Sequence, residues 1–392
     1  MVHLSPAMRA VEPYPFEELD RRAAAARAEG RTLIDFGVGD PREVTPAFIR
    51  DALKAAVEPV SSYPRAAGLP ELREAVCGWL SRRYGVGLDP DLDVLPILGS
   101  KELVFSLAQA VLDPAQGRNL VAVTAPGYPI PERGARWAGG DLVRLPLHEA
   151  NGFLADLDAV DAAQWERTAL LWLNYPNNPT GAVAPLDYLV HAADLARRHG
   201  FLLVSDEAYS ELWFDGAPPP GVLQVGDLSN VLAINTLSKR SSMTGYRSGF
   251  AAGDRGLIAA LKRLRPSVGV TPQEFVQRAS VVAWGDETHV EENRARYAAK
   301  RAVFMDMFAQ TGIEVAASAA TFYLWVKVPP GTTSLAWAMD LLDRAGVIVA
   351  PGSFFGPEGE GYARMAMVPA PEDCTRAAAV MEELLRSSEV AP

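Results

Sequence analysis

One lysine of this 392-residue sequence stands in a setting that suits covalent chemistry. Lys239 lies in the segment Asn230–Asp254 (NVLAINTLSKRSSMTGYRSGFAAGD), which predicts a strand, a polar turn and a second strand with Arg247 near its start. An amine held among hydroxyls after a strand can hold a carbonyl cofactor as a Schiff base, leaving the hydroxyls and the arginine for a phosphate. The alternative is an ordinary surface lysine, because lysine side chains are mostly exposed.

Two further signals follow predicted strands of the same region, where open α/β sheets bind their ligands. Gly99-Ser100-Lys101 ends a strand and opens an apolar helix, whose first N–H groups suit a phosphate. Gly-Ser is also a common helix start without any ligand. Tyr128 follows the next strand and is expected either to stack on a flat ring or to belong to the core.

Two more signals lie at the ends of strongly apolar runs. Residues 174–181 (NYPNNPTG) form a rigid turn that can present the amide of Asn178, although turn chemistry alone explains such a composition. Asp206 and Tyr209 follow the run FLLVS at 201–205. A carboxylate after so apolar a strand is partly buried and needs a cationic partner. That partner is either a protonated pyridine nitrogen or an arginine.

Together these signals predict a site for pyridoxal 5'-phosphate. Lys239 would bond the cofactor, Asp206 would keep its ring nitrogen protonated, and Tyr128 would stack on the ring. The phenolic oxygen would accept hydrogen bonds from Asn178 and Tyr209. The phosphate would bind a set of hydroxyl and cationic side chains with the adjoining helix start, namely Ser100, Lys101, Thr236, Ser238 and Arg247.

The composition excludes several other classes of protein. Net charge is −11, from 37 Lys+Arg against 48 Asp+Glu, which argues against nucleic acid or an anionic membrane as partner. Cys77 and Cys374 lie far apart without metal-ligand spacing, so no metal site is expected and both read as reduced thiols. The N-terminus lacks a signal-peptide pattern and no run is apolar enough to span a membrane. We expect a cytoplasmic protein.

The pattern of elements predicts an α/β fold in two parts. From about residue 95, continuous apolar strands alternate with helices, which favours a mostly parallel central sheet covered on both faces. We expect a large cofactor-binding domain at 47–285 and a smaller α+β domain made of 1–46 and 286–392, with a helix within residues 12–30. Residues 37–41 (GVGDP) lack the third glycine of a dinucleotide fingerprint, so no nicotinamide site is predicted there.

The ordered motifs resemble the class I/II aminotransferases of PLP fold type I, over essentially the whole chain. The resemblance rests on NPTG at 178–181, on Asp206-x-x-Tyr209, and on Ser238-Lys239 with Arg247. It implies a large domain with a mostly parallel sheet, a smaller α+β domain, and transfer of an amino group between an amino acid and a 2-oxo acid. Lys239 would carry the proton between the substrate Cα and the cofactor.

The resemblance also implies roles for residues that no spacing argument singles out. Arg364 (GEGYARMAM) would grip the substrate α-carboxylate, with Gly39 and Asn178 lining the same place. Tyr63 would reach the cofactor phosphate of a second subunit, which implies a homodimer with shared active sites.

Within the family, several segments look like the LL-diaminopimelate and N-succinyldiaminopimelate aminotransferases: GSKE at 99–102, NGFLADLDAV at 151–160, NYPNNPTGAVA at 174–184, SKRSSMTGYRSGF at 238–250 and GEGY at 359–362. This implies a diaminopimelate-type donor in lysine biosynthesis, with glutamate and 2-oxoglutarate as one substrate pair. Three alternatives stay open: a broad alanine/aspartate-type aminotransferase, a PLP-dependent C–S β-lyase, and a PLP-sensing regulator. The regulator would need a DNA-binding segment, and the acidic balance argues against one.

Overall fold

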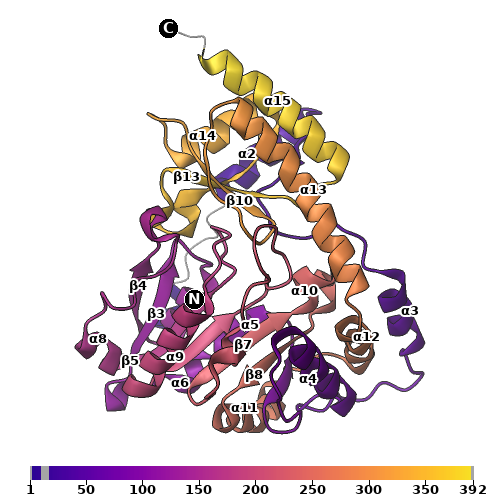
Figure 1. The fold of residues 1–392 in the computed structure, drawn as a ribbon, viewed down its shortest axis with the longest axis vertical. Helices are drawn as coiled ribbons and strands as arrows, with labels where there is room; N and C mark the ends of the chain where they lie inside the picture. Colours follow the sequence, from indigo (N-terminus) through magenta and orange to yellow (C-terminus); the bar gives the residue numbers. More distant parts are fainter. Residues whose placement is uncertain (1, 10–16, 390–392) are drawn as a thin grey trace.

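A seven-stranded sheet forms the centre of the molecule (Figure 1). The computed structural model describes residues 2–9 and 17–389. Four neighbouring pairings are parallel, whereas β8 runs antiparallel to both of its neighbours. The predicted mostly parallel sheet is therefore confirmed. In spatial order the strands are β2 (Val94–Ile97), β8 (Gly249–Gly253), β7 (Val231–Thr236), β6 (Leu202–Asp206), β5 (Thr168–Asn174), β3 (Leu120–Ala125) and β4 (Asp141–Pro146).

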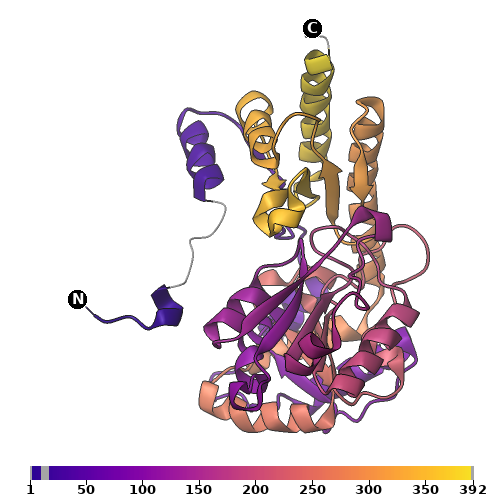
Figure 2. The same ribbon diagram turned by 90° about the vertical axis from the view of Figure 1, so that its left-hand side faces the viewer.

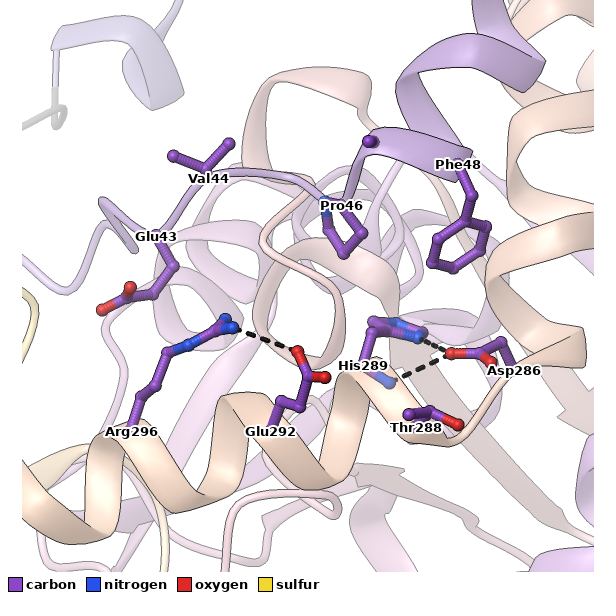
Figure 3. Close-up of a pocket in the computed structure, with 10 residues that line it drawn as sticks. Glu43, Val44, Pro46, Phe48, Asp286, Thr288, His289, Glu292 and Arg296 are labelled. Carbon is purple, nitrogen blue, oxygen red and sulfur yellow. Dashed lines mark hydrogen bonds and ion pairs between the residues drawn. The ribbon is translucent and has the colours of Figure 1, made fainter.

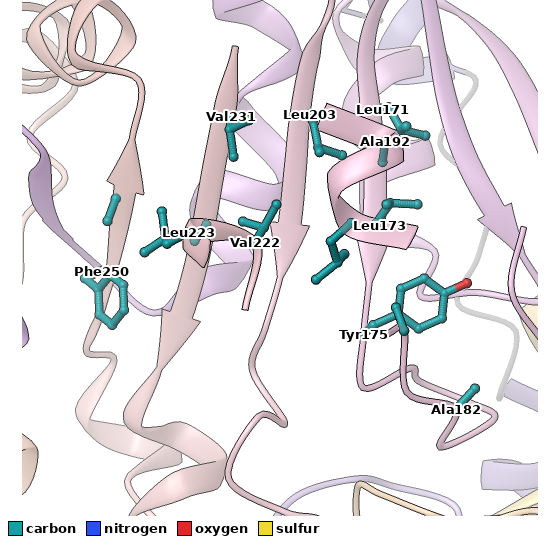
Figure 4. Packing of buried hydrophobic residues seen from close by; sticks show 14 of the residues in the cluster. Leu171, Leu173, Tyr175, Ala182, Ala192, Leu203, Val222, Leu223, Val231 and Phe250 are labelled. Carbon is teal, nitrogen blue, oxygen red and sulfur yellow. The ribbon is translucent and has the colours of Figure 1, made fainter. Parts of the chain in front are cut away.

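Both faces of this sheet are apolar because successive side chains of a strand point to opposite sides. In β6, Leu203 packs into one cluster and Val204 into the other, which explains the continuous apolar runs. One face is covered by α5 (Ser100–Ser106), α6 (Ala108–Val111), α7 (Ile130–Trp137) and α11 (Arg255–Val268). The other is covered by α4 (Pro70–Tyr84), α8 (Ala162–Arg167), α9 (Leu186–His199) and α12 (Glu274–Gly285). Figure 4 shows Leu171 and Leu203 of the strands on the side where Ala192 of α9 lies.

A smaller region lies at one end of this body (Figures 1 and 2). Its antiparallel sheet has the order β12 (Ala350–Pro351), β13 (Tyr362–Ala366), β10 (Tyr323–Lys327) and β9 (Val315–Ala317). The helices α14 (Ser334–Asp340) and α15 (Pro371–Glu389) belong to it. The helix α13 (Thr288–Gln310) runs from the large sheet's helices to α15 and so links the two regions. At 1.5 Å per residue it is about 35 Å long.

The N-terminal part contributes to both regions. The short strand β1 (Ile34–Asp35) pairs in parallel with β11 (Val347–Ile348), whereas α3 (Ala47–Ala55) packs against α12. The predicted helix within residues 12–30 corresponds to α2 (Glu17–Ala28), and its entry at 12–16 lies outside the described residues. A further turn of helix, α1, spans Pro6–Arg9. Within residues 2–9 and 17–389, no helix has the length and apolar character that crossing a membrane requires.

The segment around Lys239 is more ordered than a turn. Thr236 ends β7, and its hydroxyl accepts a hydrogen bond from the N–H of Ser238 (3.2 Å). This N-cap starts a single helical turn, α10 (Leu237–Arg240), so Lys239 stands on a helix where the sequence predicted a polar turn. Arg247 precedes β8 by two residues and has a left-handed backbone (φ 55°), so it lies outside the strand that the sequence predicted.

Candidate active site

The carboxyl ends of three parallel strands meet at one hollow of about 320 Å³. Asn174 ends β5, Asp206 ends β6 and Thr236 ends β7, which places them side by side at the sheet edge where such folds bind ligands. Every predicted site residue except Tyr63 lines this hollow: Gly39, Ser100, Lys101, Tyr128, Asn178, Asp206, Tyr209, Thr236, Ser238, Lys239, Arg247 and Arg364. A volume of this size falls within the range of small-molecule sites.

Lys239 is an amine of lowered basicity. Burial lowers its pKa to about 8, the nearby carboxylate of Asp40 opposes that change, and the charges of Arg364 and Arg247 add to it. Its Nζ donates a hydrogen bond to the carbonyl oxygen of Gly39 at 2.6 Å. A substantial fraction of the side chain is therefore neutral slightly above neutral pH, and a neutral amine is the form that attacks a carbonyl.

Asp206 is a buried carboxyl group of raised pKa. Burial raises its pKa to about 6, against hydrogen bonding from the Ala208 N–H (3.2 Å) and the charge of Lys239. It forms no ion pair with any residue in the described ranges. No arginine of the described residues forms an ion pair with Asp206, so the cationic group of a ligand can compensate this charge.

Arg364 presents a partly satisfied guanidinium to the hollow. Its Nη1 donates to the Asn178 side-chain oxygen (2.9 Å) and its Nη2 donates to the carbonyl oxygen of Gly37 (2.6 Å). The Nε is buried and has no hydrogen-bond partner within residues 2–9 and 17–389. Tyr323 and Phe355 lie 4.3 and 4.6 Å from the guanidinium carbon, measured to their ring centroids. Such a rigid, buried guanidinium suits a carboxylate.

Hydroxyls and a second arginine occupy another part of the hollow. Thr236 and Ser238 join their hydroxyl oxygens at 2.9 Å, and Arg247 donates from Nη1 to the Thr244 carbonyl oxygen (2.9 Å). Gly99 allows the guanidinium to lie this close, since a Cβ there would stand 2.4 Å from the Arg247 Nη2. This group of donors has the composition that a phosphate requires.

Sequence reasoning missed several residues of the hollow. Tyr323 comes from β10 of the small sheet, and its hydroxyl lies 2.9 Å from that of Tyr209. Gly39 leaves room for Tyr323, because a Cβ there would stand 2.0 Å from the tyrosine oxygen. Asn174 accepts from the Asn178 N–H (2.9 Å) and so fixes that turn; its place at the end of an apolar strand was a signal that could have identified it. Also missed were Gly37, Val38, Asp40, Ala208 and Thr244.

Tyr63 lies apart from the other predicted residues. Its side chain is 99% exposed, and it does not line the hollow. The role implied for it involves a second subunit, so its position in one chain leaves that role a prediction.

The chain belongs to the aminotransferase class I and II family, whose model matches residues 31–381. Proteins of this family use pyridoxal phosphate to move amino groups between small amino and 2-oxo acids, so the predicted family, enzyme class and cofactor are confirmed. The donor set fits that cofactor: an amine of lowered pKa, a buried acid without an ion-pair partner among the described residues, and hydroxyls beside an arginine.

The chain is similar to two curated LL-diaminopimelate aminotransferases. That of Dehalococcoides mccartyi is 38% identical over 368 residues, covering 93% of this chain and 94% of the relative. That of Aquifex aeolicus is 37% identical, with 98% and 100% covered. Among solved structures, an aminotransferase from Neisseria meningitidis has a TM-score of 0.90 at 36% identity, covering 98% of this chain and 100% of that one. BacF from Bacillus subtilis reaches 0.91 at 31% identity, with 98% of each chain covered.

Proposed function

We propose that this aminotransferase takes its amino group from a diaminopimelate-type donor, in lysine biosynthesis, and passes it to 2-oxoglutarate. The observation that carries the proposal is the near full-length similarity to curated LL-diaminopimelate aminotransferases. The hollow also offers the carboxylate of Asp40, which neither the cofactor nor the α-carboxylate of the substrate requires. A donor with a second ammonium at its far end matches this carboxylate in charge.

We propose the following roles for the predicted site residues. Asp206 would hold the proton on the pyridine nitrogen, and Tyr128 would lie against the ring. Asn178 and Tyr209 would donate to the phenolic oxygen. The phosphate would be held by Ser100, Lys101, Thr236, Ser238 and Arg247. When bound, the cofactor supplies an electron sink for charge that develops at the substrate Cα.

Arg364 would bind the substrate α-carboxylate, with Asn178 and the backbone near Gly39 completing that contact. Support comes from its buried Nε, which has no hydrogen-bond partner in the described part of the chain, and from its fixed geometry between two aromatic rings. Lys239 Nζ would remove the proton from the Cα, since its lowered pKa makes the neutral amine available near neutral pH. The loop at Gly37–Asp40 would help to exclude water from this proton transfer.

We further propose that two copies of the chain assemble with shared active sites. The support is the exposure of apolar side chains around Tyr63: Val57 is 59% exposed and Val60 is 78% exposed. A patch of this kind is typical of an interface between proteins. Residues 47–285 would form the cofactor-binding domain, and 1–46 with 286–392 the small domain. The pairing of β1 with β11 supports that division.

The test compares amino donors with the purified holoprotein. With 2-oxoglutarate as acceptor, we expect kcat/KM for LL-diaminopimelate to exceed that for alanine or aspartate by at least about tenfold. Lys239→Ala is the control for rates that do not depend on the site. Equal or faster transfer from alanine or aspartate would contradict the proposed donor. Pyruvate formed from a cysteine-type substrate without any oxo-acid acceptor would identify a β-lyase instead.

A further inference from the structure

The first two turns of α13 present two polar side chains to the segment that carries Lys239. His289 and Asn293 are four residues apart, so they lie on the same face of the helix. Both are buried, at 6% and 3% exposure. His289 reaches the Ser241 hydroxyl (2.9 Å), and Asn293 donates from Nδ2 to the carbonyl oxygen of Lys239 (3.3 Å) and to that of Arg240 (3.4 Å).

His289 belongs to a chain of hydrogen bonds in which every donor and acceptor can be assigned. Figure 3 shows His289 beside Asp286, whose carboxylate lies 2.6 Å from the imidazole Nδ1. Hydrogen bonds from His289, whose ring and backbone N–H both point at it, hold the pKa of Asp286 below its usual value against the effect of burial. Burial lowers the pKa of His289, so its imidazole is neutral at neutral pH. An ionised carboxylate only accepts, so Nδ1 carries the proton and Nε2 accepts from the Ser241 hydroxyl.

The other end of this chain is a buried cation. Arg240 donates from Nη1 to the Ser241 oxygen (3.3 Å) and to the Ala283 carbonyl oxygen (2.7 Å). Its guanidinium carbon lies 5.7 and 5.0 Å from the ring centroids of Trp79 and Trp284. The chain therefore runs from Arg240 through Ser241 and His289 to the carboxylate of Asp286. It resembles a Ser-His-Asp array in geometry, but Ser241 is 1% exposed and has no access to a substrate.

The second contact, through Asn293, is made at the expense of stability. Among the described residues the buried Asn293 Oδ1 has no hydrogen-bond partner, and an unmet buried acceptor lowers the stability of the fold. An apolar side chain would avoid that cost but would leave the Lys239 carbonyl without this donor. The arrangement indicates that Asn293 serves the geometry of α10 more than the stability of the fold.

We propose that His289, Ser241 and Asn293 are positioning residues for the catalytic lysine. They clamp α10 to the start of α13 and so fix the direction from which the Lys239 side chain enters the active-site hollow. Two charged groups face the imidazole of His289: the carboxylate of Asp286, from the α12–α13 turn, and the guanidinium of Arg240, from α10. Glu292 and His289 both line a second, separate pocket on the surface. Phe48 of α3 covers its edge, with 5.5 Å between ring centroids. This inference rests on the role proposed above for Lys239.

The test removes the hydrogen bond between His289 and Ser241 by changing either partner, and it measures the pKa of Lys239. His289→Asn and Ser241→Ala are made separately and together, and the pKa of Lys239 is read in the apoprotein from the NMR shift of labelled lysine Cε. The chain has six lysines, so the Lys239 signal is assigned by its loss in Lys239→Ala. His191→Asn is the matched control, because His191 also contacts an aspartate, Asp158, at 2.9 Å but lies on α9, away from α10.

We expect both single variants to raise the Lys239 pKa by at least about 0.5, because a less confined amine becomes better hydrated. In the holoprotein, kcat should fall roughly ten- to a hundredfold with little change in KM for the amino acid. The double variant should be no worse than either single one. Asn293→Ala should lower kcat without lowering the melting temperature.

An unchanged Lys239 pKa in both single variants, with kcat as in His191→Asn, would overturn the inference even if Lys239 is essential. If Lys239→Ala itself keeps the wild-type rate, the proposed function fails instead, so the two failures are distinguishable. Should His289→Asn not fold, Ser241→Ala and Asn293→Ala provide the test, since each removes side-chain hydrogen bonds of the clamp without adding volume.

Discussion

Replacing Asp206 with asparagine should stabilise the apoprotein against unfolding and greatly reduce the activity of the holoprotein. In the fold, burial raises the pKa of this carboxyl from 3.8 to about 6. The unfolded chain ionises first, so the wild-type protein loses stability as pH rises through that interval. The free energy of unfolding is lowered by about 3 kcal/mol at pH 7 and by about half of that at pH 5. Asparagine carries no charge and keeps an oxygen that can accept from the Ala208 N–H, so it escapes this loss.

The assay is urea unfolding of wild-type and Asp206→Asn apoproteins at pH 5, 7 and 8, at equal protein concentration. The stability gained by the variant should increase from pH 5 to pH 7 and then level off. With the cofactor bound, the wild-type protein should be the more stable of the two, because asparagine cannot hold the pyridine nitrogen in its protonated form. We expect a loss of at least about a hundredfold in kcat.

Glu207 provides the matched control. It is the next residue and is also buried, and burial raises its pKa to about 7. Its carboxylate accepts from the Val222 N–H (2.7 Å) and the Ser205 hydroxyl (3.0 Å), outside the active-site hollow. Glu207→Gln should show a pH-dependent gain in stability without losing the cofactor. An Asp206→Asn apoprotein that is less stable than wild type at pH 7, or whose gain does not depend on pH, would refute the reasoning.

Three further predictions concern neighbouring groups. Arg364→Lys should raise KM for the amino acid by roughly ten- to a hundredfold in steady-state kinetics, because an ammonium cannot replace the two-pronged guanidinium contact; an unchanged KM would contradict the carboxylate role. Gly39→Ala should lower kcat, because its Cβ would displace the Tyr323 hydroxyl 2.0 Å away and with it the contact to Tyr209; wild-type kcat would show that this packing does not matter. The rate at which the apoprotein binds the cofactor, measured by stopped-flow absorbance, should rise with pH and level off. Its midpoint should lie near the Lys239 pKa of about 8, because only the neutral amine attacks. A rate that falls over this range would contradict the role given to Lys239.

Two of the site residues that the sequence identified lie at the carboxyl ends of strands. Asp206 and Thr236 end strands whose continuous apolar runs mark them as buried parallel strands, and the carboxyl ends of such strands meet at one edge. Asn174 also ends an apolar parallel strand, and it lies opposite Asp206 in the neighbouring strand. The same reasoning should therefore have included it.

The residues that were missed depend on packing between distant segments. Tyr323 reaches the hollow only because β10 of the small sheet lies above the large one, and nothing in its own strand marks it. The clamp of His289 and Asn293 on α10 likewise arises from the path of α13 and has no motif. Lys239 was placed in a polar turn because the Thr236 cap, which begins the helical turn, was not recognised.

The central claim is that Lys239, in this hollow, holds the cofactor. Borohydride reduction of the purified holoprotein makes the bond between lysine and cofactor permanent, and mass spectrometry of the digest then locates it among the six lysines of the chain. We predict a single modified residue, Lys239, and no modification after prior incubation with a good amino donor. Modification of Lys101 or any other lysine, with Lys239 unmodified, would contradict the account.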